Sequence, residues 1–286
     1  MKAAAFAYVR PATLDESFAL LERYGDEAKI LAGGQSLIPA LNMRVAMPRV
    51  LIDIGGLVEL AGIRSSESEV HIGALTRHRD IERSHDVAQH LPLLHRAMPH
   101  VAHPAIRNRG TFGGSIALAD PAAEIPACAL ALDASFIVAS ASGKRTIAAR
   151  DFFRGIYETA LGPGEILLGA RFPAAQPDYR FAFGELARRH GDFAIAGLAA
   201  RARVVGEVLS DVRLAYFGVG AKPSLAGSAA AAMEGRAFSA GVLSAAQAAL
   251  EQDLEPLADA HHAAVSKMHL ARVLTGRVMM QLAHGS

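Results

Sequence analysis

The chain has 286 residues, 51% of them hydrophobic, so it is long enough to bury a sizeable core and to form two or three modest domains. Its 29 Lys and Arg residues nearly balance 28 Asp and Glu residues, which argues against binding to nucleic acid or to an anionic membrane. The N-terminus lacks the features of a secretory signal, and no apolar run is long enough to span a membrane, so we expect a cytoplasmic protein without a transmembrane segment. The single cysteine, Cys128, excludes an internal disulfide and an iron–sulfur cluster held by four thiolates of this chain.

The N-terminal residues alternate between helical and strand patterns. Thr13 starts a capping-box spacing that predicts a short helix, and Gly25 is expected to end it. Residues 29–31 and 49–54 each predict a buried strand. Residues 1–56 are therefore expected to form a small α/β unit with parallel strands.

From residue 57 the pattern changes to short strands, tight turns and short helices. We expect a hairpin over 63–73, helices over 77–84 and 92–100, strands over 135–139, 166–172, 194–205 and 212–219, and a helix over 267–283. Pro173 and Pro177 bracket a linker. These features predict a middle domain with an antiparallel sheet over 57–175 and a C-terminal domain with a small sheet and helices over 176–286.

The first candidate binding segment is Ala32-Gly33-Gly34-Gln35-Ser36, directly after a predicted strand. Glycines let backbone N–H groups approach a phosphate closely, and a helix capped by Ser36 would direct its free amides at that anion. An ordinary strand-to-helix turn that needs glycine for positive φ is the alternative, and for this loop taken alone it is favoured.

A second loop of the same type follows about 75 residues later, as Gly110-Thr111-Phe112-Gly113-Gly114-Ser115. Two such loops, each with a hydroxyl residue, suit a ligand with two phosphates, because together they can hold one pyrophosphate. Two unrelated turns remain an equal alternative from the local sequence. Neither loop is a P-loop or the dinucleotide fingerprint of NAD-binding proteins.

The segment after the second loop carries two carboxylates among small residues. Glu124 is placed to accept hydrogen bonds from ligand hydroxyls, although the local sequence favours a turn at Asp120 and an exposed acid in a first helical turn. His95, His100 and His103 lack the spacing that directs ligands at one metal ion. We therefore expect no metal site, and no residue is predicted to be catalytic.

Together these segments resemble the FAD-binding medium subunit of molybdenum hydroxylases, such as carbon monoxide dehydrogenase and the xanthine dehydrogenase relatives. The resemblance covers essentially the whole chain. It rests on long motifs at residues 31–39, 106–115 and 119–127, in the right order and spacing, and on residues 191–194 and 269–272. Such long motifs are far more specific than either glycine pair.

The resemblance implies an α+β fold of the FAD-binding PCMH/VAO type, with two FAD-binding subdomains and a C-terminal antiparallel sheet with a helical bundle. FAD would lie between the two subdomains. The implied cofactor-binding residues are Leu31, Ala32, Gly33, Gly34, Gln35, Ser36, Leu37, Gly110, Thr111, Gly113, Gly114 and Ser115 around the pyrophosphate, Val101 and Glu124 near the adenosine or ribityl portion, and Leu161, Ile166, Leu167 and Phe193 near the isoalloxazine ring.

The resemblance also sets expectations at single residues. The chain has Gln35, Glu185 and Phe193 where several relatives have His, Lys and Tyr, which changes the polar groups offered to a flavin. Gly33 and Gly114 are interpreted as residues that admit phosphate. Valine at either position is therefore expected to block FAD binding and to leave the fold largely intact.

The implied function is electron transfer. In such complexes a large partner subunit oxidises the substrate at a molybdenum–pterin cofactor, a small partner carries two [2Fe–2S] clusters, and FAD in this chain passes electrons to an external acceptor. The resemblance further implies a dimer of heterotrimers, which its partners would place either free in the cytoplasm or peripherally at the inner face of the membrane. The alternatives are a stand-alone FAD-dependent reductase of the same superfamily and a flavin-free assembly subunit.

Overall fold

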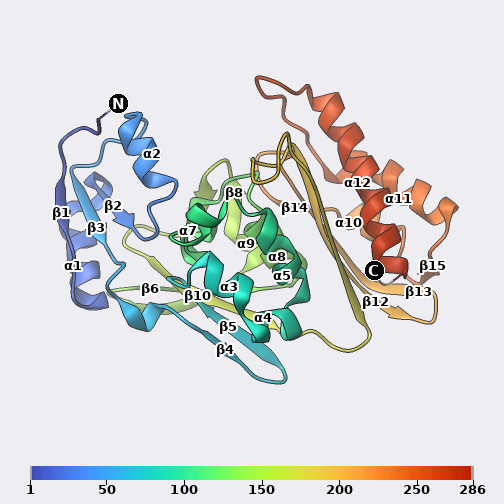
Figure 1. Cartoon of the computed structure of the whole chain (residues 1–286), viewed down its shortest axis with the longest axis horizontal. Coiled ribbons are helices and arrows are strands. Elements are labelled where there is room, and N and C mark those ends of the chain that lie inside the picture. Colours follow the sequence, from blue (N-terminus) through green and yellow to red (C-terminus); the bar gives the residue numbers. More distant parts are fainter. Residues whose placement is uncertain (1, 285–286) are drawn as a thin grey trace.

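The computed structural model describes residues 2–284 and places three units side by side in sequence order (Figure 1). The N-terminal unit has a parallel sheet of strand order β1-β3-β2. It comprises β1 (Ala7–Val9), β2 (Ala28–Leu31), β3 (Val50–Asp53), α1 (Leu14–Tyr24) and α2 (Leu37–Asn42), with 3-10 turns at Gly25–Glu27 and Val58–Leu60. The Thr13 hydroxyl accepts a hydrogen bond from the Glu16 amide at the start of α1, and Gly25 ends that helix. The parallel pairing expected for these strands is confirmed.

The middle unit is built on an antiparallel five-stranded sheet of order β4-β5-β10-β6-β7. Its strands are β4 (Ile63–Ser65), β5 (Glu69–Gly73), β6 (Ser135–Ser140), β7 (Gly143–Ala148) and β10 (Ile166–Pro173), and β8 (Phe153–Gly155) pairs with β9 (Glu158–Thr159). Its helices are α3 (His78–Arg83), α4 (His85–His90), α5 (Pro92–Ala97), α6 (Pro104–Arg107), α7 (Phe112–Leu118), α8 (Glu124–Ala131) and α9 (Ala149–Phe152), with a 3-10 turn at Met98–His100. Alternate strand residues such as Ile72, Phe136 and Phe172 face these helices and form the core.

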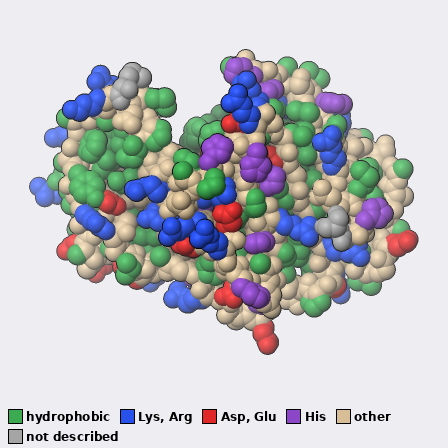
Figure 2. Space-filling view, viewed as in Figure 1, with side chains coloured by type: hydrophobic (Ala, Val, Ile, Leu, Met, Phe, Trp, Pro, Cys, Tyr) green, Lys and Arg blue, Asp and Glu red, His purple; other side chains and the backbone are tan. Residues whose placement is uncertain are grey.

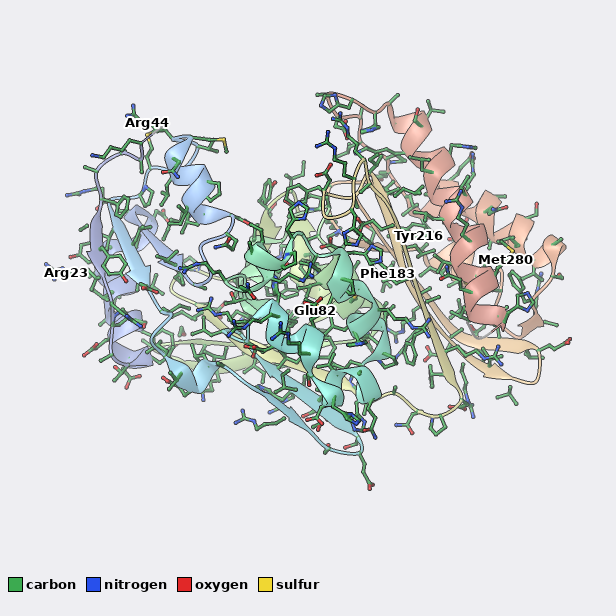
Figure 3. All side chains as sticks on the ribbon, in the orientation of Figure 1. Arg23, Arg44, Glu82, Phe183, Tyr216 and Met280 are labelled. Carbon is green, nitrogen blue, oxygen red and sulfur yellow. The ribbon has the colours of Figure 1, made fainter. Side chains whose placement is uncertain are left out.

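The C-terminal unit is an antiparallel sheet between two helical layers (Figure 1). It comprises β11 (Tyr179–Leu186), β12 (Ala196–Val205), β13 (Val208–Phe217), β14 (Ser224–Leu225), β15 (Arg236–Ala237), α10 (Gly227–Ala231), α11 (Ala240–Asp253) and α12 (Ala264–His284). Phe183 of β11 belongs to the core of the middle unit, while Tyr216 of β13 packs toward α12 and shares a 2.7 Å hydrogen bond with Thr275 (Figure 3). This sheet therefore joins the middle unit to the terminal helices.

The structure corrects three expectations about local structure. Ser36 precedes α2 but its side chain makes no capping hydrogen bond. Strands β7 and β11 were not predicted, because β7 begins with four consecutive exposed residues and β11 interrupts its large apolar residues with Ala182 and Gly184. Among residues 2–284, no helix is long and apolar enough to cross a membrane.

Candidate functional site

The two glycine loops, far apart in sequence, are in direct backbone contact. A Cβ atom built on Gly33 would lie 2.5 Å from the carbonyl oxygen of Arg109, 2.9 Å from the Cα of Gly110 and 3.1 Å from the amide nitrogen of Thr111. Only glycine permits this approach. The fold thus brings both predicted phosphate loops to one junction between the N-terminal and middle units, where the surface is hollowed (Figure 2).

The first loop offers free backbone donors at this junction. Within residues 2–284, the N–H groups of Gly34, Gln35 and Ser36 donate no hydrogen bond, whereas the next turn begins with the Ile38 amide bonded to Gly34 at 3.0 Å. Gly34 has φ of 72°, which glycine adopts without strain. The side chains of Leu31 and Ile38 flank it. Three adjacent unpaired amides before a helix form the kind of concavity that binds a phosphate group.

The backbone amides of the second loop mostly donate their hydrogen bonds to other groups of the protein. The Gly113 amide donates to the Ala74 carbonyl at 2.8 Å, and the Gly114 amide donates to the Thr111 hydroxyl at 3.2 Å. Thr111 therefore acts as the N-cap of α7. The Ser115 hydroxyl makes no hydrogen bond with the described residues. The loop is thus a rigid support with fewer free donors than the first.

His78 is a residue of this site that the sequence did not indicate, since no motif spacing marks it. Its buried ring lies under Gly110, where an added Cβ would be 2.9 Å from the ring Nδ1. Neither ring nitrogen meets hydrogen-bond geometry with any described residue. Burial lowers the pKa of His78 to about 4, with an opposing contribution from the Thr111 backbone and smaller lowering contributions from Arg107 and Arg77. The ring is therefore neutral at physiological pH and fills the space beneath the second loop.

Val101 lies in a turn held by a buried arginine. Arg107 donates to the carbonyls of Val101 at 3.1 Å and Ala102 at 3.0 Å, and pairs with Glu82 through two bonds of 2.9 and 3.0 Å (Figure 3). Gly191 approaches this same turn, because a Cβ on it would lie 2.9 Å from the Ala102 carbonyl oxygen. The turn that carries Val101 thus touches the loop that carries Phe193.

Phe193 is not a core residue. It lies between β11 and β12 in the loop that contacts Ala102, and 70% of its surface is exposed. A large aromatic side chain that is this exposed has apolar area available to a ligand. That Phe193 flanks a flavin ring stays a prediction.

The remaining predicted residues differ in accessibility. Glu124 is the first residue of α8, as expected, but it is buried, so the expectation of an exposed acid was wrong. Burial, with a smaller contribution from the charge of Asp120, raises the pKa of Glu124 to about 7. Leu161 is half-buried after β9, whereas Ile166 and Leu167 of β10 are buried in two hydrophobic clusters. Their side chains therefore contribute to the core.

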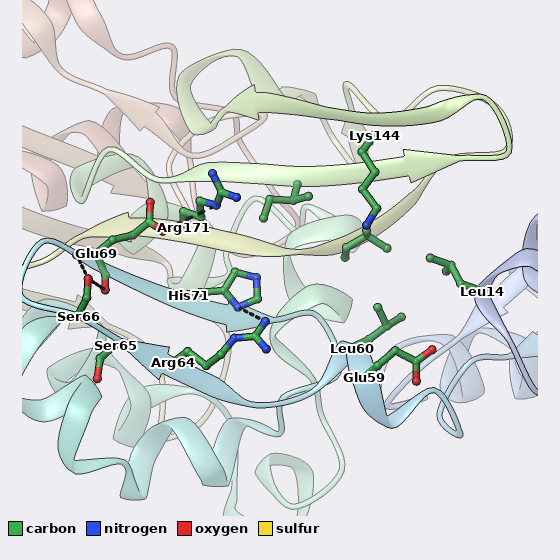
Figure 4. A pocket seen from close by; sticks show the side chains of 12 residues that line it. Leu14, Glu59, Leu60, Arg64, Ser65, Ser66, Glu69, His71, Lys144 and Arg171 are labelled. Carbon is green, nitrogen blue, oxygen red and sulfur yellow. Dashed lines mark hydrogen bonds and ion pairs between the residues drawn. The ribbon is translucent and has the colours of Figure 1, made fainter.

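A pocket of about 610 Å³ lies away from the glycine loops, on the opposite face of the middle sheet (Figure 4). Its floor includes Ile137 and Leu168, and Arg64, His71 and Arg171 extend across neighbouring strands. It contains none of the predicted cofactor-binding residues. Among residues 2–284, no group of His, Cys, Asp and Glu is arranged to hold a metal ion.

Comparison with known families identifies the family to which this chain belongs. Residues 4–175 match the family described as "FAD binding domain in molybdopterin dehydrogenase", and residues 181–282 match "CO dehydrogenase flavoprotein C-terminal domain". The chain therefore belongs to the family of FAD-binding medium subunits of molybdenum hydroxylases, which are components of oxidoreductases. The predicted fold class and the predicted family are confirmed.

Particular relatives extend over nearly the whole chain. The 6-hydroxypseudooxynicotine dehydrogenase complex subunit alpha of Paenarthrobacter nicotinovorans is 37% identical over 99% of this chain and 96% of its own length. Carbon monoxide dehydrogenase from Hydrogenophaga pseudoflava superposes with a TM-score of 0.96 at 38% identity, over 99% of this chain and 98% of that one. Quinoline 2-oxidoreductase from Pseudomonas putida 86 gives a TM-score of 0.93 at 36% identity, over 100% and 99%.

Proposed function

We propose that this chain is the FAD-binding electron-transfer subunit of a heterotrimeric molybdenum hydroxylase. It would take electrons from the [2Fe–2S] clusters of a small partner subunit and pass them to an external acceptor, while a large partner oxidises the substrate at a molybdenum–pterin cofactor. The observation that carries the proposal is the contact of Gly33 with the second glycine loop, beside three unpaired amides, within an FAD-binding domain.

The residues present fit FAD. The free amides of Gly34, Gln35 and Ser36 would hold the pyrophosphate, with the second loop as a rigid wall behind them. The exposed ring of Phe193 would cover the isoalloxazine and exclude water from it. Bound flavin supplies redox chemistry that couples one-electron donors to two-electron acceptors, and the protein binds and orients it.

The chain's composition supports the proposal that partner subunits hold the iron–sulfur clusters and the molybdenum cofactor. With one cysteine, which is buried and whose thiol pKa is raised by burial, this chain does not itself supply four thiolates for a cluster. The clusters and the molybdenum cofactor would thus belong to partners, in a dimer of heterotrimers in the cytoplasm. We assign residues 1–56 and 57–175 to the two FAD-binding subdomains and 176–286 to the C-terminal domain.

The proposal is tested by purifying the chain with its co-purifying partners, recording an absorbance spectrum and identifying the acid-released flavin. FAD together with iron–sulfur absorbance is the expected result. FAD in a chain that turns over a substrate with NADPH and without partners would instead indicate a stand-alone reductase. A colourless complex that does not take up added FAD would indicate an assembly subunit and contradict the proposal.

Phe193 provides a sharper test of the ring position. Phe193→Ala is expected to weaken FAD binding about tenfold and to leave the free energy of unfolding within about 0.5 kcal/mol, because an exposed side chain contributes little to the core. FAD titration monitored by flavin fluorescence and urea unfolding of the flavin-free chain measure the two quantities. An unchanged dissociation constant for FAD would show that the isoalloxazine ring does not lie against Phe193.

A further inference from the structure

The middle sheet carries a pocket on the face turned away from its helices (Figure 4). In β5, His71 alternates with Val70 and Ile72, which belong to the core of the middle unit, so the His71 side chain extends from the other face. The volume of about 610 Å³ is in the range of small-molecule sites. Leu14 of α1 also lines the pocket, which therefore lies beside the N-terminal unit.

Arg64 of β4, His71 of β5 and Arg171 of β10 form a donor row across this face. Arg64 lies directly opposite His71 in the paired strands, and His71 lies directly opposite Arg171. Burial, followed by the charges of the two arginines, lowers the pKa of His71, so its ring is neutral at pH 7. The Arg64 Nη2 atom lies 3.4 Å from the His71 Nδ1 atom, and because arginine only donates, the ring proton is on Nε2. This Nε2–H group makes no hydrogen bond with residues 2–284, so it is available to a ligand.

The acids that line the pocket compensate the charge of the donor row only in part. Glu69 contacts Arg171 at 3.8 Å, and because both side chains are about half exposed this pair contributes little. Arg64 forms no ion pair within residues 2–284. Glu59 lies beside Leu60, and its carboxylate points away from Arg64 (Figure 4). The donor row therefore keeps a positive charge that no carboxylate of the described residues neutralises.

An apolar floor extends from the donor row along the sheet. Ile137 of β6 lies opposite Gly169, which precedes Arg171 by two positions in β10. The pairing of β10 with β6 shifts just before Gly169, and such a bulge re-aims side chains, here leaving Leu168 in the lining of the pocket. Lys144 of β7 lies opposite the residue two positions after Ile137. The pocket thus offers, in order along the sheet, the donor row, an apolar floor and a second cation.

We propose that this pocket binds a small aromatic anion, with its carboxylate or phosphate group at the donor row and its ring on Ile137 and Leu168. A guanidinium offers parallel N–H donors that match either anionic group, and the neutral imidazole adds another donor. The ring would bury apolar area on the floor, while Lys144 adds a longer-range attraction from the far end. The pocket lies apart from the glycine loops, so this inference does not depend on the proposed FAD site.

The test is calorimetric titration of the full chain with 2-naphthoate and with 2-naphthyl phosphate, in excess FAD so that neither compound enters the proposed flavin site. We expect a dissociation constant of about 100 μM for the tighter of the two, which identifies the anionic group, and binding of uncharged 2-naphthol at least about tenfold weaker. Arg64→Ala should weaken binding of the anion about tenfold, and Lys144→Ala only about threefold, because Lys144 lies beyond the floor. Glu69→Gln should strengthen it about twofold, because it releases Arg171.

Arg83→Ala is the matched control, because Arg83 is an exposed arginine of α3 outside the pocket and its loss changes the net charge equally. Circular dichroism checks that each variant is folded. The absence of binding, equal binding of 2-naphthol, or unchanged affinity in both Arg64→Ala and Lys144→Ala would overturn the anion site. Binding to the chain alone that disappears in the complex with its partners would assign this face to a subunit contact, and would overturn it as well. A chain that binds no FAD would contradict the proposed function without affecting the outcome at this pocket.

Discussion

Gly33→Ala is expected to raise the dissociation constant for FAD about a hundredfold, equivalent to about 2.7 kcal/mol. The new methyl group would lie 2.5 Å from the carbonyl oxygen of Arg109 and 2.9 Å from the Cα of Gly110. Both are backbone atoms, which cannot rotate away as a flexible side chain would. The two loops must therefore separate, and the amides of the first loop lose their position relative to the second.

The measurement is FAD titration of the flavin-free chain, combined with urea unfolding. Overpacking at this junction should also reduce the free energy of unfolding, by about 1–3 kcal/mol. Gly241→Ala is the matched control, since no atom lies within 4 Å of the added Cβ in α11, and alanine favours a helix. Wild-type FAD affinity in Gly33→Ala would show that the loop junction does not form the binding site.

This geometry changes the explanation for the glycines. From the sequence, Gly33 and Gly114 were interpreted as residues that admit phosphate and whose replacement spares the fold. In the structure a Cβ on Gly33 meets protein backbone, and a Cβ on Gly114 meets the Thr111 hydroxyl at 2.7 Å. Packing against protein backbone therefore requires Gly33, so the expectation that valine spares the fold was wrong there, whereas Gly114 contacts only a side chain.

The sequence predicted the parts of the site that have local patterns. Gly33 and Gly114 belong to motifs with a known order and spacing, and the capping hydroxyl of Thr13 depends on residues only three positions away. Family resemblance then supplied the fold, which is confirmed.

Features that arise from long-range packing could not be predicted. His78 becomes part of the site because the chain returns at Gly110, and the Oε2 atom of Glu185 becomes buried because β11 packs against the middle unit. Glu124 has the sequence signature of an exposed first-turn acid, and only the tertiary packing of α8 buries it. Each of these depends on residues distant in sequence, which neither helical nor strand periodicity records.

The second large effect is expected at Glu82, far from any recognised motif. Arg107 is buried, with 8% of its side chain exposed, and Glu82 provides its two carboxylate contacts. Glu82→Ala leaves that guanidinium buried without a counter-charge, which should reduce the free energy of unfolding by about 3 kcal/mol. Chemical denaturation monitored by circular dichroism measures this loss.

An exposed ion pair provides the control for this prediction. Glu27 makes a comparable two-bond contact with Arg49, but both side chains are at least half exposed, so Glu27→Ala should cost less than about 1 kcal/mol. Arg107 also holds the Val101 and Ala102 carbonyls, so Glu82→Ala should weaken FAD binding as the turn loosens. Equal losses of stability in the two variants would show that burial of Arg107 does not determine its contribution. If Glu82→Ala loses stability as expected but binds FAD with unchanged affinity, the turn at Val101 is not part of the cofactor site. Arg107 would then stabilise the fold without positioning the ligand.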